Sequence, residues 1–323
     1  MCISGIFLGS ASARRSLVGG RITACNMYQA IVSPEKDQHF IDIVLEQTLK
    51  DIGIPSRPEI LDRIAAEMSQ DEPNFRKLGR LVNADMGLAA SLIKTANSPF
   101  LGFSSKARSA SDALTMLGLD AANRAIAGIS VRKTFSSDIR LERFWRESAQ
   151  IAALSGLLAQ MPSRRSLRTD DAHTFGLFRD CGVPVMLRRF PTYGEILAHA
   201  SEDSEHPFTE IERQGLAEFP TDHAMIGCLL AQSWLLPEEI SLAIRYHHEP
   251  SILDTFIVDL PSTCRQFIAV GRTAEHILQD LTGVSETGEW KKSGASCLRL
   301  LDLTDGDLRG IYATAATVIE AVD

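Results

Sequence analysis

Two adjacent histidines, His247 and His248, stand near the end of the segment AIRYHHEP, residues 243–250. Imidazole side chains bind metal ions and transfer protons near neutral pH, so this pair could do either. The two follow Ile244 by three and four residues, which places both at the border of the apolar face of the expected helix. His223 borders the apolar face of another expected helix. One such histidine is more often a hydrogen-bonded core residue than a ligand, but three on neighbouring helices favour a shared site.

A metal site at these histidines would need a further ligand, and Asp180 in the segment GLFRDCG is the candidate. One aspartate and three histidines are enough by number for a single ion. That set is Asp180, His223, His247 and His248. A hydrolytic site with two metal ions needs more carboxylates and excludes nearby guanidinium groups. Because Arg179 directly precedes Asp180, the sequence argues against a second ion.

The elements that must position these residues are all predicted to be helices. Apolar residues recur at helical spacing from residue 56 onward, and no long stretch alternates with a period of two. Helix starts are marked by capping-box patterns at 56–59 and 209–212, by Pro237 with two following glutamates, and by Thr304. In the second half, helices are expected near 171–180, 192–200, 209–218, 221–234, 237–248 and 262–282, with loops at 161–171 and 285–294. The prediction is an all-α fold, a multi-helix globule.

Composition and charge exclude several classes of partner. The net charge of −8 gives no electrostatic footprint for nucleic acid, and no apolar run approaches the ~20 residues of a membrane-spanning helix. The six cysteines form no CxxC pair, which indicates reduced thiols in a cytoplasmic protein. The basic loop at 161–171 could present Arg164, Arg165 and Arg168 to an acidic partner, although a solvated loop is the simpler interpretation.

A series of segments resembles the bacterial HDOD domain. In order they are PSRPEILDRIAAEM, LGRLVNADMGLAASLIKTANSPFLG, ALTMLGLDAANRAI, FWRESAQIAALSGLLA, GLFRDCG and TDHAMIGCLLAQSWLLPEEISLAIRYHHEP, and they cover roughly residues 53–250 with a continuation to about 282. The resemblance implies an N-terminal helical subdomain packed on an HD-like helical bundle. It divides the chain into an N-terminal arm (1–36), the N-terminal helical half of the domain (37–136), its HD-like half (137–283), and a C-terminal loop and helix (284–323).

HDOD domains look like HD-type phosphohydrolases whose metal signature has decayed. Carried over to this chain, the first ligand histidine of the HD pattern becomes Glu147, and the His-Asp pair becomes Arg179-Asp180. The later histidines are matched by His223, His247 and His248, and the closing aspartate is replaced by Arg272. We therefore expect a vestigial pocket without metal or other cofactor, in which Arg179 and Arg272 replace the charge of a metal and pair with Glu147 and Asp180. A solvent-facing Arg179 is the alternative.

The resemblance implies a noncatalytic module of bacterial signal transduction that binds another signalling protein. One alternative is an enzyme, a metal-dependent phosphohydrolase or cyclic-nucleotide phosphodiesterase that uses a single ion at Asp180, His223, His247 and His248. Arg179 would then bind a substrate phosphate. Another alternative is a sensor whose arginines hold an anionic small ligand. Stoichiometric metal would favour the enzyme, and a metal-free response to nucleotides would favour the sensor.

Overall fold

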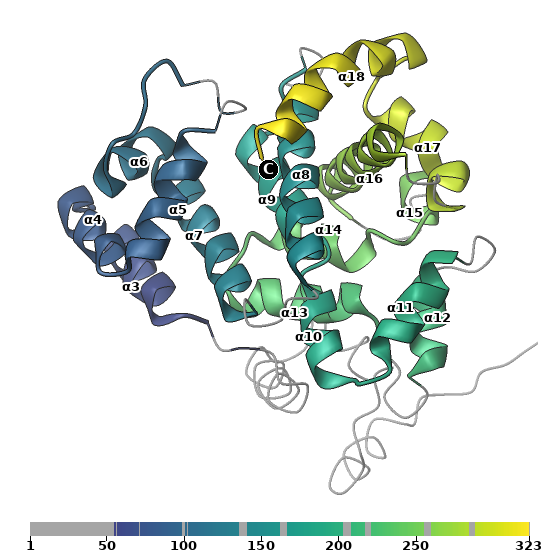
Figure 1. Ribbon diagram of the computed structural model, residues 1–323, viewed down its shortest axis with the longest axis horizontal. Coiled ribbons are helices and arrows are strands. Elements are labelled where there is room, and N and C mark those ends of the chain that lie inside the picture. Colours follow the sequence, from purple (N-terminus) through teal and green to yellow (C-terminus); the bar gives the residue numbers. More distant parts are fainter. Residues whose placement is uncertain are drawn as a thin grey trace, which may run out of the picture. The chain divides into compact units, whose positions relative to one another are not determined.

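The computed structural model describes residues 55, 57–70, 72–98, 101, 103–135, 141–161, 167–202, 208–216, 221–254, 260–283 and 288–322. Every regular element in these ranges is an α-helix, which confirms the all-α prediction. The helices (Figure 1) are α3 (Glu59–Met68), α4 (Phe75–Asn83), α5 (Met86–Ala96), α6 (Ala110–Leu117), α7 (Leu119–Thr134), α8 (Glu142–Ala159), α9 (Thr169–Phe178), α10 (Gly182–Arg189), α11 (Tyr193–Glu202), α12 (Phe208–Gly215), α13 (His223–Ser233), α14 (Glu238–Tyr246), α15 (Ser251–Asp254), α16 (Ser262–Thr282), α17 (Gly288–Leu300) and α18 (Asp305–Glu320). All of them belong to one compact unit, residues 49–323. None of these described helices has both the length and the apolar character that crossing a bilayer requires.

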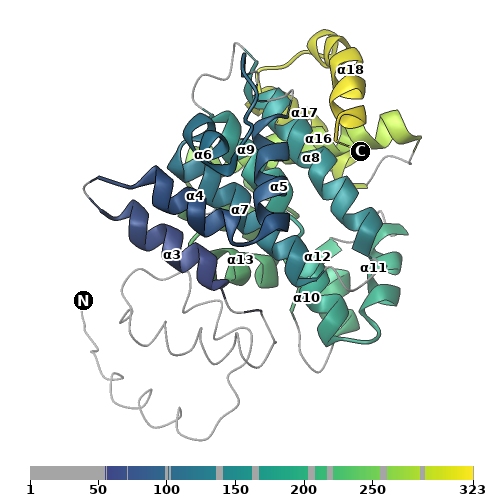
Figure 2. The same ribbon diagram turned by 60° about the vertical axis from the view of Figure 1, so that its left-hand side comes forward.

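Helices α3 to α7 pack against one another as an N-terminal group (Figure 2). Side-chain caps fix three of their starts, because Asn74, Asp85 and Ser109 each accept a hydrogen bond from a backbone N–H in the following first turn. Helix α3 begins after Pro58, which is its N-cap rather than a first-turn residue, and Ser56 of the predicted capping box lies outside the described residues. Helix α7 joins this group to the remaining helices through its packing on α9.

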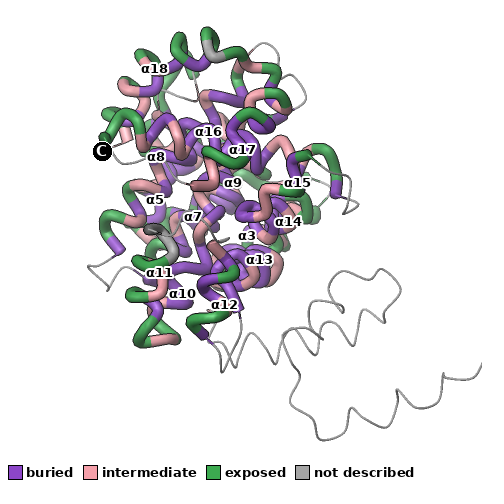
Figure 3. Tube along the Cα trace, turned by 90° about the vertical axis from the view of Figure 1, so that its right-hand side faces the viewer, coloured by how far each residue is buried: buried purple, intermediate pink, exposed green. Residues whose placement is uncertain are grey.

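The second group is an HD-like bundle built around α8, α9 and α16, with α13 and α14 beside them. Buried residues run through α13, α14 and α16 (Figure 3). Two glycines allow backbones to meet closely. A Cβ on Gly176 would lie 2.8 Å from the Cα of Ala152 on α8, and a Cβ on Gly182 would lie 2.0 Å from the carbonyl oxygen of His223 on α13. The start of α10 is therefore held against the start of α13, where one of the singled-out histidines stands.

Two helices of the second group depart from the sequence-based expectation. The segment 182–189 is α10, although its glycine and proline favour a turn. Helix α17 begins at Gly288, inside the stretch 285–294 that we predict as a loop. There Trp290 stacks on His276 of α16 with ring centroids 4.1 Å apart, and Ser293 is buried. Tertiary packing of this kind overrides local propensity.

The C-terminal helix α18 starts as predicted. The Thr304 hydroxyl accepts from the backbone N–H of Asp307, and the Asp307 carboxylate accepts from the backbone N–H of Thr304. Pro237 likewise stands as the N-cap of α14, directly before Glu238 and Glu239 in its first turn, where the helix dipole favours acidic groups. Local sequence signals therefore set these two starts.

Candidate functional site

Three helix ends meet at one largely buried point. Asp180 lies two residues after α9, His223 is the first residue of α13, and His247 and His248 directly follow α14. One possible ligand atom from each of these four residues lies within 4.8 Å of the others. We call this set the histidine pocket. The structure thus brings together the four residues that the sequence singles out as possible metal ligands.

The donor atoms of the histidine pocket face one another. His223 Nε2 lies 3.4 Å from His247 Nε2 and 3.0 Å from His248 Nε2. Asp180 Oδ1 lies 3.1 Å from His247 Nε2 and 3.5 Å from His223 Nε2. Ligands bound tetrahedrally at ~2.0–2.1 Å from an ion are about 3.3 Å from each other. The spacing of these atoms therefore fits one tetrahedral ion.

The other ring nitrogen of each histidine has an oxygen partner. The Nδ1 contacts are His223 to Glu212 Oε1 at 2.8 Å, His247 to the Ile244 carbonyl at 2.7 Å, and His248 to Glu289 Oε1 at 2.5 Å. A carbonyl or a carboxylate can only accept, so Nδ1–H donates and each neutral ring keeps a lone pair on Nε2. These contacts also fix how the rings are turned, as outer partners do for histidines that bind metals.

Glu212 corrects one sequence-based assignment. The pattern at 209–212 predicts a capping box, but α12 begins at Phe208 and Glu212 lies in its second turn. Its side chain is 0 % exposed and accepts hydrogen bonds from the Tyr193 hydroxyl and from the backbone N–H of His223, in addition to the His223 ring. Glu212 therefore ties α11 and α12 to the histidine pocket instead of capping a helix.

Arg179 points inward and lies between two carboxylates. Its Nε and Nη2 donate to Asp180 Oδ2 at 3.0 and 2.9 Å, and its Nη1 donates to Glu275 Oε2 on α16 at 3.0 Å. The side chain is only 6 % exposed. Arg179 thus holds one oxygen of Asp180 and leaves the other, Oδ1, to the histidines.

Glu147 does not take the place expected for it. Its side chain is 44 % exposed on α8 and accepts a hydrogen bond from Arg143 Nε at 2.7 Å, one helical turn earlier. The prediction that Glu147 pairs with Arg179 is therefore wrong. The reason is geometric, because residue 147 faces solvent on α8 while Glu275 stands on the face of α16 that meets Arg179.

Arg272 is buried and holds the chain at the end of α14. Its Nε and Nη2 donate to the carbonyl oxygen of His247 at 2.9 and 2.5 Å, and its Nη1 donates to the Ser293 hydroxyl on α17 at 2.6 Å. The last carbonyls of a helix lack partners within the helix, and a cation there also suits the helix dipole. Arg272 therefore fixes the backbone that carries His247 and His248.

Only one of the three histidines carries a proton charge in this arrangement at neutral pH. Burial lowers the pKa of His247 to about 3, with neighbouring His248 acting in the same direction, and burial holds the pKa of His248 well below its usual value. Burial also opposes a charge on His223, but Glu212 and Asp180 outweigh it and raise the pKa of His223 to about 10. His223 is therefore the cationic ring, and its Nδ1 faces Glu212.

Helix α12 covers one side of the histidine pocket with an aromatic ring. Phe208 stacks on His248 with ring centroids 4.8 Å apart and an interplanar angle of 7°, and it meets His223 edge-on at 5.5 Å. Arg213 on the same helix donates to Asp222 at 2.8 Å. The pocket is thus closed by a helix that the pocket itself anchors through Glu212.

Asp222 sets the start of α13, directly before His223. Its Oδ1 accepts from the Met225 backbone N–H at 2.7 Å and its Oδ2 accepts from Arg213. We expect Asp222→Ala to lower the free energy of unfolding by about 2 kcal/mol, roughly half from the lost cap and the rest from the unpaired arginine. Urea unfolding beside Asp222→Asn, which keeps a capping oxygen, tests this expectation. Equal losses in the two variants would contradict the contribution of the cap.

The basic loop lies mostly outside the described residues, among them Arg164 and Arg165. Arg168 is described and pairs with Asp170 at 2.9 Å, next to Arg124 of α7, which also pairs with Asp170. A role of the three arginines in binding an acidic partner stays a prediction.

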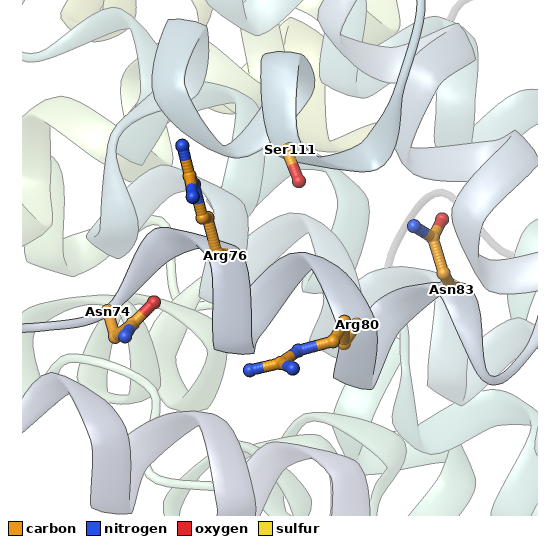
Figure 4. A pocket seen from close by; sticks show the side chains of 5 residues that line it. All are labelled: Asn74, Arg76, Arg80, Asn83 and Ser111. Carbon is orange, nitrogen blue, oxygen red and sulfur yellow. The ribbon is translucent and has the colours of Figure 1, made fainter.

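A pocket in the N-terminal group is the other candidate (Figure 4). It is lined by Asn74, Arg76, Arg80, Asn83 and Ser111, from α4, its N-cap and α6. The guanidinium groups of Arg76 and Arg80 point in different directions rather than toward one point. The pocket therefore lacks the convergent polar groups of a binding site, and the histidine pocket is the stronger candidate.

Comparisons with known proteins agree with this arrangement of helices. The HDOD domain model matches residues 54–250. An HDOD domain protein of unknown function from Geobacter sulfurreducens has a similar structure, with a TM-score of 0.60, 23 % identity, and coverage of 89 % of this chain and 98 % of that chain. A protein from Shewanella amazonensis SB2B, provisionally described as a phosphohydrolase, gives a TM-score of 0.61 at 18 % identity over 86 % and 96 % of the two chains. Identities this low show the fold alone.

Two further relatives are longer than this chain. A protein from Marinobacter aquaeolei VT8, provisionally described as a signal transduction protein, gives a TM-score of 0.61 at 20 % identity over 91 % of this chain and 66 % of that one. An uncharacterised protein from Treponema pallidum (strain Nichols) is 25 % identical over 198 residues, 60 % of this chain. The chain spans 37 % of the length of that relative.

Proposed function

Because this chain belongs to the HDOD domain family, we propose that it is a noncatalytic regulatory module of signal transduction that acts by binding a partner. The observation that carries the proposal is the place of Arg179, between Asp180 and Glu275. Hydrolytic sites with two metal ions hold both ions between shared carboxylates. A guanidinium bonded to these two carboxylates already supplies the positive charge there, so a second ion would be repelled.

The closure of the histidine pocket supports the same proposal. A catalytic metal keeps a coordination position open for water or substrate, whereas a structural metal is surrounded by protein ligands. Here four protein donors face one another, and the ring of Phe208 stacks on His248 at the side. No position for a reacting phosphate follows from this arrangement of the described residues.

The expected partner is another signalling protein, and the Marinobacter relative, provisionally described as a signal transduction protein, is in keeping with it. An anionic small ligand is the other partner considered. Neither nucleic acid nor a membrane belongs to the proposal, since the chain has a net charge of −8. The cytoplasmic location inferred from the scattered cysteines is also part of it, and Cys181, Cys228, Cys264 and Cys297 are free thiols.

A metal-dependent phosphohydrolase is the second candidate. The observation in its favour is that Asp180 and three histidines do converge, as a single-metal enzyme would need. The Shewanella relative, provisionally described as a phosphohydrolase, points the same way. Arg179 would have to bind a substrate phosphate in such an enzyme, yet its fork is already engaged by two carboxylates.

Hydrolysis assays separate the two candidates. We expect the protein, supplied in turn with Zn²⁺, Mn²⁺ and Fe²⁺, to hydrolyse bis(p-nitrophenyl) phosphate and cyclic nucleotides no faster than its Asp180→Asn variant. A rate that depends on Asp180 would establish the enzyme and refute the noncatalytic proposal. Thermal unfolding with and without nucleotides, in buffer with chelator, tests the ligand sensor. A rise in Tm there would identify the partner as an anionic small molecule.

A further inference from the structure

The charges around the histidine pocket do not balance. Its carboxylates are Asp180, Glu212, Glu275 and Glu289. Its guanidinium groups are Arg179 and Arg272, the second of which lies 3.9 Å from Glu289. Four negative charges against two positive charges leave an excess of two. All four carboxyl side chains are no more than 26 % exposed, and buried charge of this kind is normally paired or bound to a metal.

The uncompensated charge coincides with a converging set of donors. Three Nε2 atoms and Asp180 Oδ1 face one another at 3.0–3.5 Å in the four pairs measured. With Nδ1–H donated outward from every ring, these atoms are all lone-pair donors. Lone pairs at this separation repel each other unless a cation lies between them.

We propose that the histidine pocket binds one divalent transition-metal ion, through Asp180 Oδ1 and the Nε2 atoms of His223, His247 and His248, in a closed structural site. Three imidazoles and one carboxylate suit Zn²⁺ best among the common ions, because Mg²⁺ and Ca²⁺ prefer all-oxygen ligands. Two positive charges offset the excess of two carboxylates. Four protein ligands complete the tetrahedron, so the ion stabilises and does not react.

This inference differs from the metal-free pocket that the sequence predicts, for an electrostatic reason. That expectation counts Arg179 and Arg272 as repelling a cation, but not Glu212, Glu275 and Glu289, which the fold brings in. The charge of Arg179 is already paired with Asp180 Oδ2 and Glu275. Asp180 is then shared, with one oxygen for the guanidinium and the other for the ion.

The outer partners of the three rings show what the ion would hold together. Glu212 belongs to α12, the Ile244 carbonyl to α14, and Glu289 to α17. Metal binding would therefore fix α12 and α17 against the ends of α9, α13 and α14. The inference does not depend on the proposed function, since a structural ion is compatible with any binding partner and its absence would leave the hydrolysis result unchanged.

The test is metal analysis of the untagged full chain purified without chelator, by elemental mass spectrometry. We expect about one equivalent of Zn²⁺ or another divalent transition metal per chain. After chelation and dialysis, added Zn²⁺ should raise Tm by roughly 5 °C or more, since a ligand that binds only the folded state stabilises it. Both effects should vanish in a His247→Ala/His248→Ala double variant.

His199→Ala is the matched control, because His199 is an exposed histidine on α11. This variant should keep the metal and the Tm response. Because the double variant could also lose its fold, Glu289→Gln provides a milder second test. It keeps a carbonyl acceptor for His248 Nδ1 but removes one charge, so it should stay folded and bind Zn²⁺ about tenfold or more weakly. Less than about a tenth of an equivalent in the wild-type protein and no Tm response would overturn the inference. So would metal retained in the double variant, which would be adventitious.

Discussion

Replacing Arg179 with alanine should lower the free energy of unfolding by about 3–5 kcal/mol, measured by urea denaturation in the presence of a chelator. The variant leaves Asp180 and Glu275 close together without the guanidinium that now bonds to both. Removing one member of a buried ion pair costs far more than the pair itself contributes, because the remaining charge is left uncompensated. The chelator keeps an added metal ion from taking the place of the arginine.

Arg143→Ala is the control for this prediction. Arg143 also pairs with a carboxylate, that of Glu147, but the two side chains are 76 % and 44 % exposed. An exposed pair one helical turn apart contributes about 0.5 kcal/mol or less. An Arg179→Ala variant as stable as Arg143→Ala would mean that Arg179 is not an internal counter-ion, and the argument against a second metal would fail with it.

Replacing Gly182 with alanine should prevent folding or cost at least about 3 kcal/mol. The new Cβ would lie 2.0 Å from the His223 carbonyl oxygen and 2.7 Å from the Gly227 backbone nitrogen. These atoms belong to the backbone of α13, so no side chain can turn aside to make room. Relief requires α10 and α13 to separate, which moves His223 away from the other pocket residues. Yield of folded protein and urea unfolding measure the effect.

Gly310→Ala provides the comparison for this second variant. Gly310 lies in α18, and no atom outside its own helix lies within 4 Å of the position of an added Cβ. Alanine in an open helix position is favoured over glycine by about 0.5–1 kcal/mol, so this variant should be slightly more stable than the wild type. If Gly182→Ala lost less than about 1 kcal/mol, the close approach of α10 to α13 would be disproved.

The helical architecture can be predicted from the sequence because its signals are local. Pro237 with its acidic neighbours and the Thr304 cap mark the starts of α14 and α18 within a residue. Helix α10 escapes prediction because Gly182 suggests a turn, whereas the structure needs glycine there for contact with α13. The first turns of α17 escape for a related reason, since Trp290 is held by a ring on another helix.

The four residues of the histidine pocket can be picked from the sequence, but their surroundings cannot. Asp180 and the three histidines are chemically distinctive residues at predicted helix ends. The partner of Arg179, Glu275, lies 96 residues further along the chain, and Glu289 lies 41 residues from His248. Nothing local distinguishes these glutamates from solvent-exposed ones. Glu212 is hidden further by a pattern that imitates a capping box.

The central claim is that the pocket has room for one ion, because Arg179 supplies the charge that a second ion would bring. A crystal structure of the protein grown with Zn²⁺, with anomalous scattering recorded at the zinc absorption edge, tests it most directly. We predict one anomalous peak among Asp180, His223, His247 and His248, with the Arg179 guanidinium still between Asp180 and Glu275. Two peaks about 3.5–4 Å apart, with Arg179 displaced, would contradict the account and indicate a hydrolytic centre.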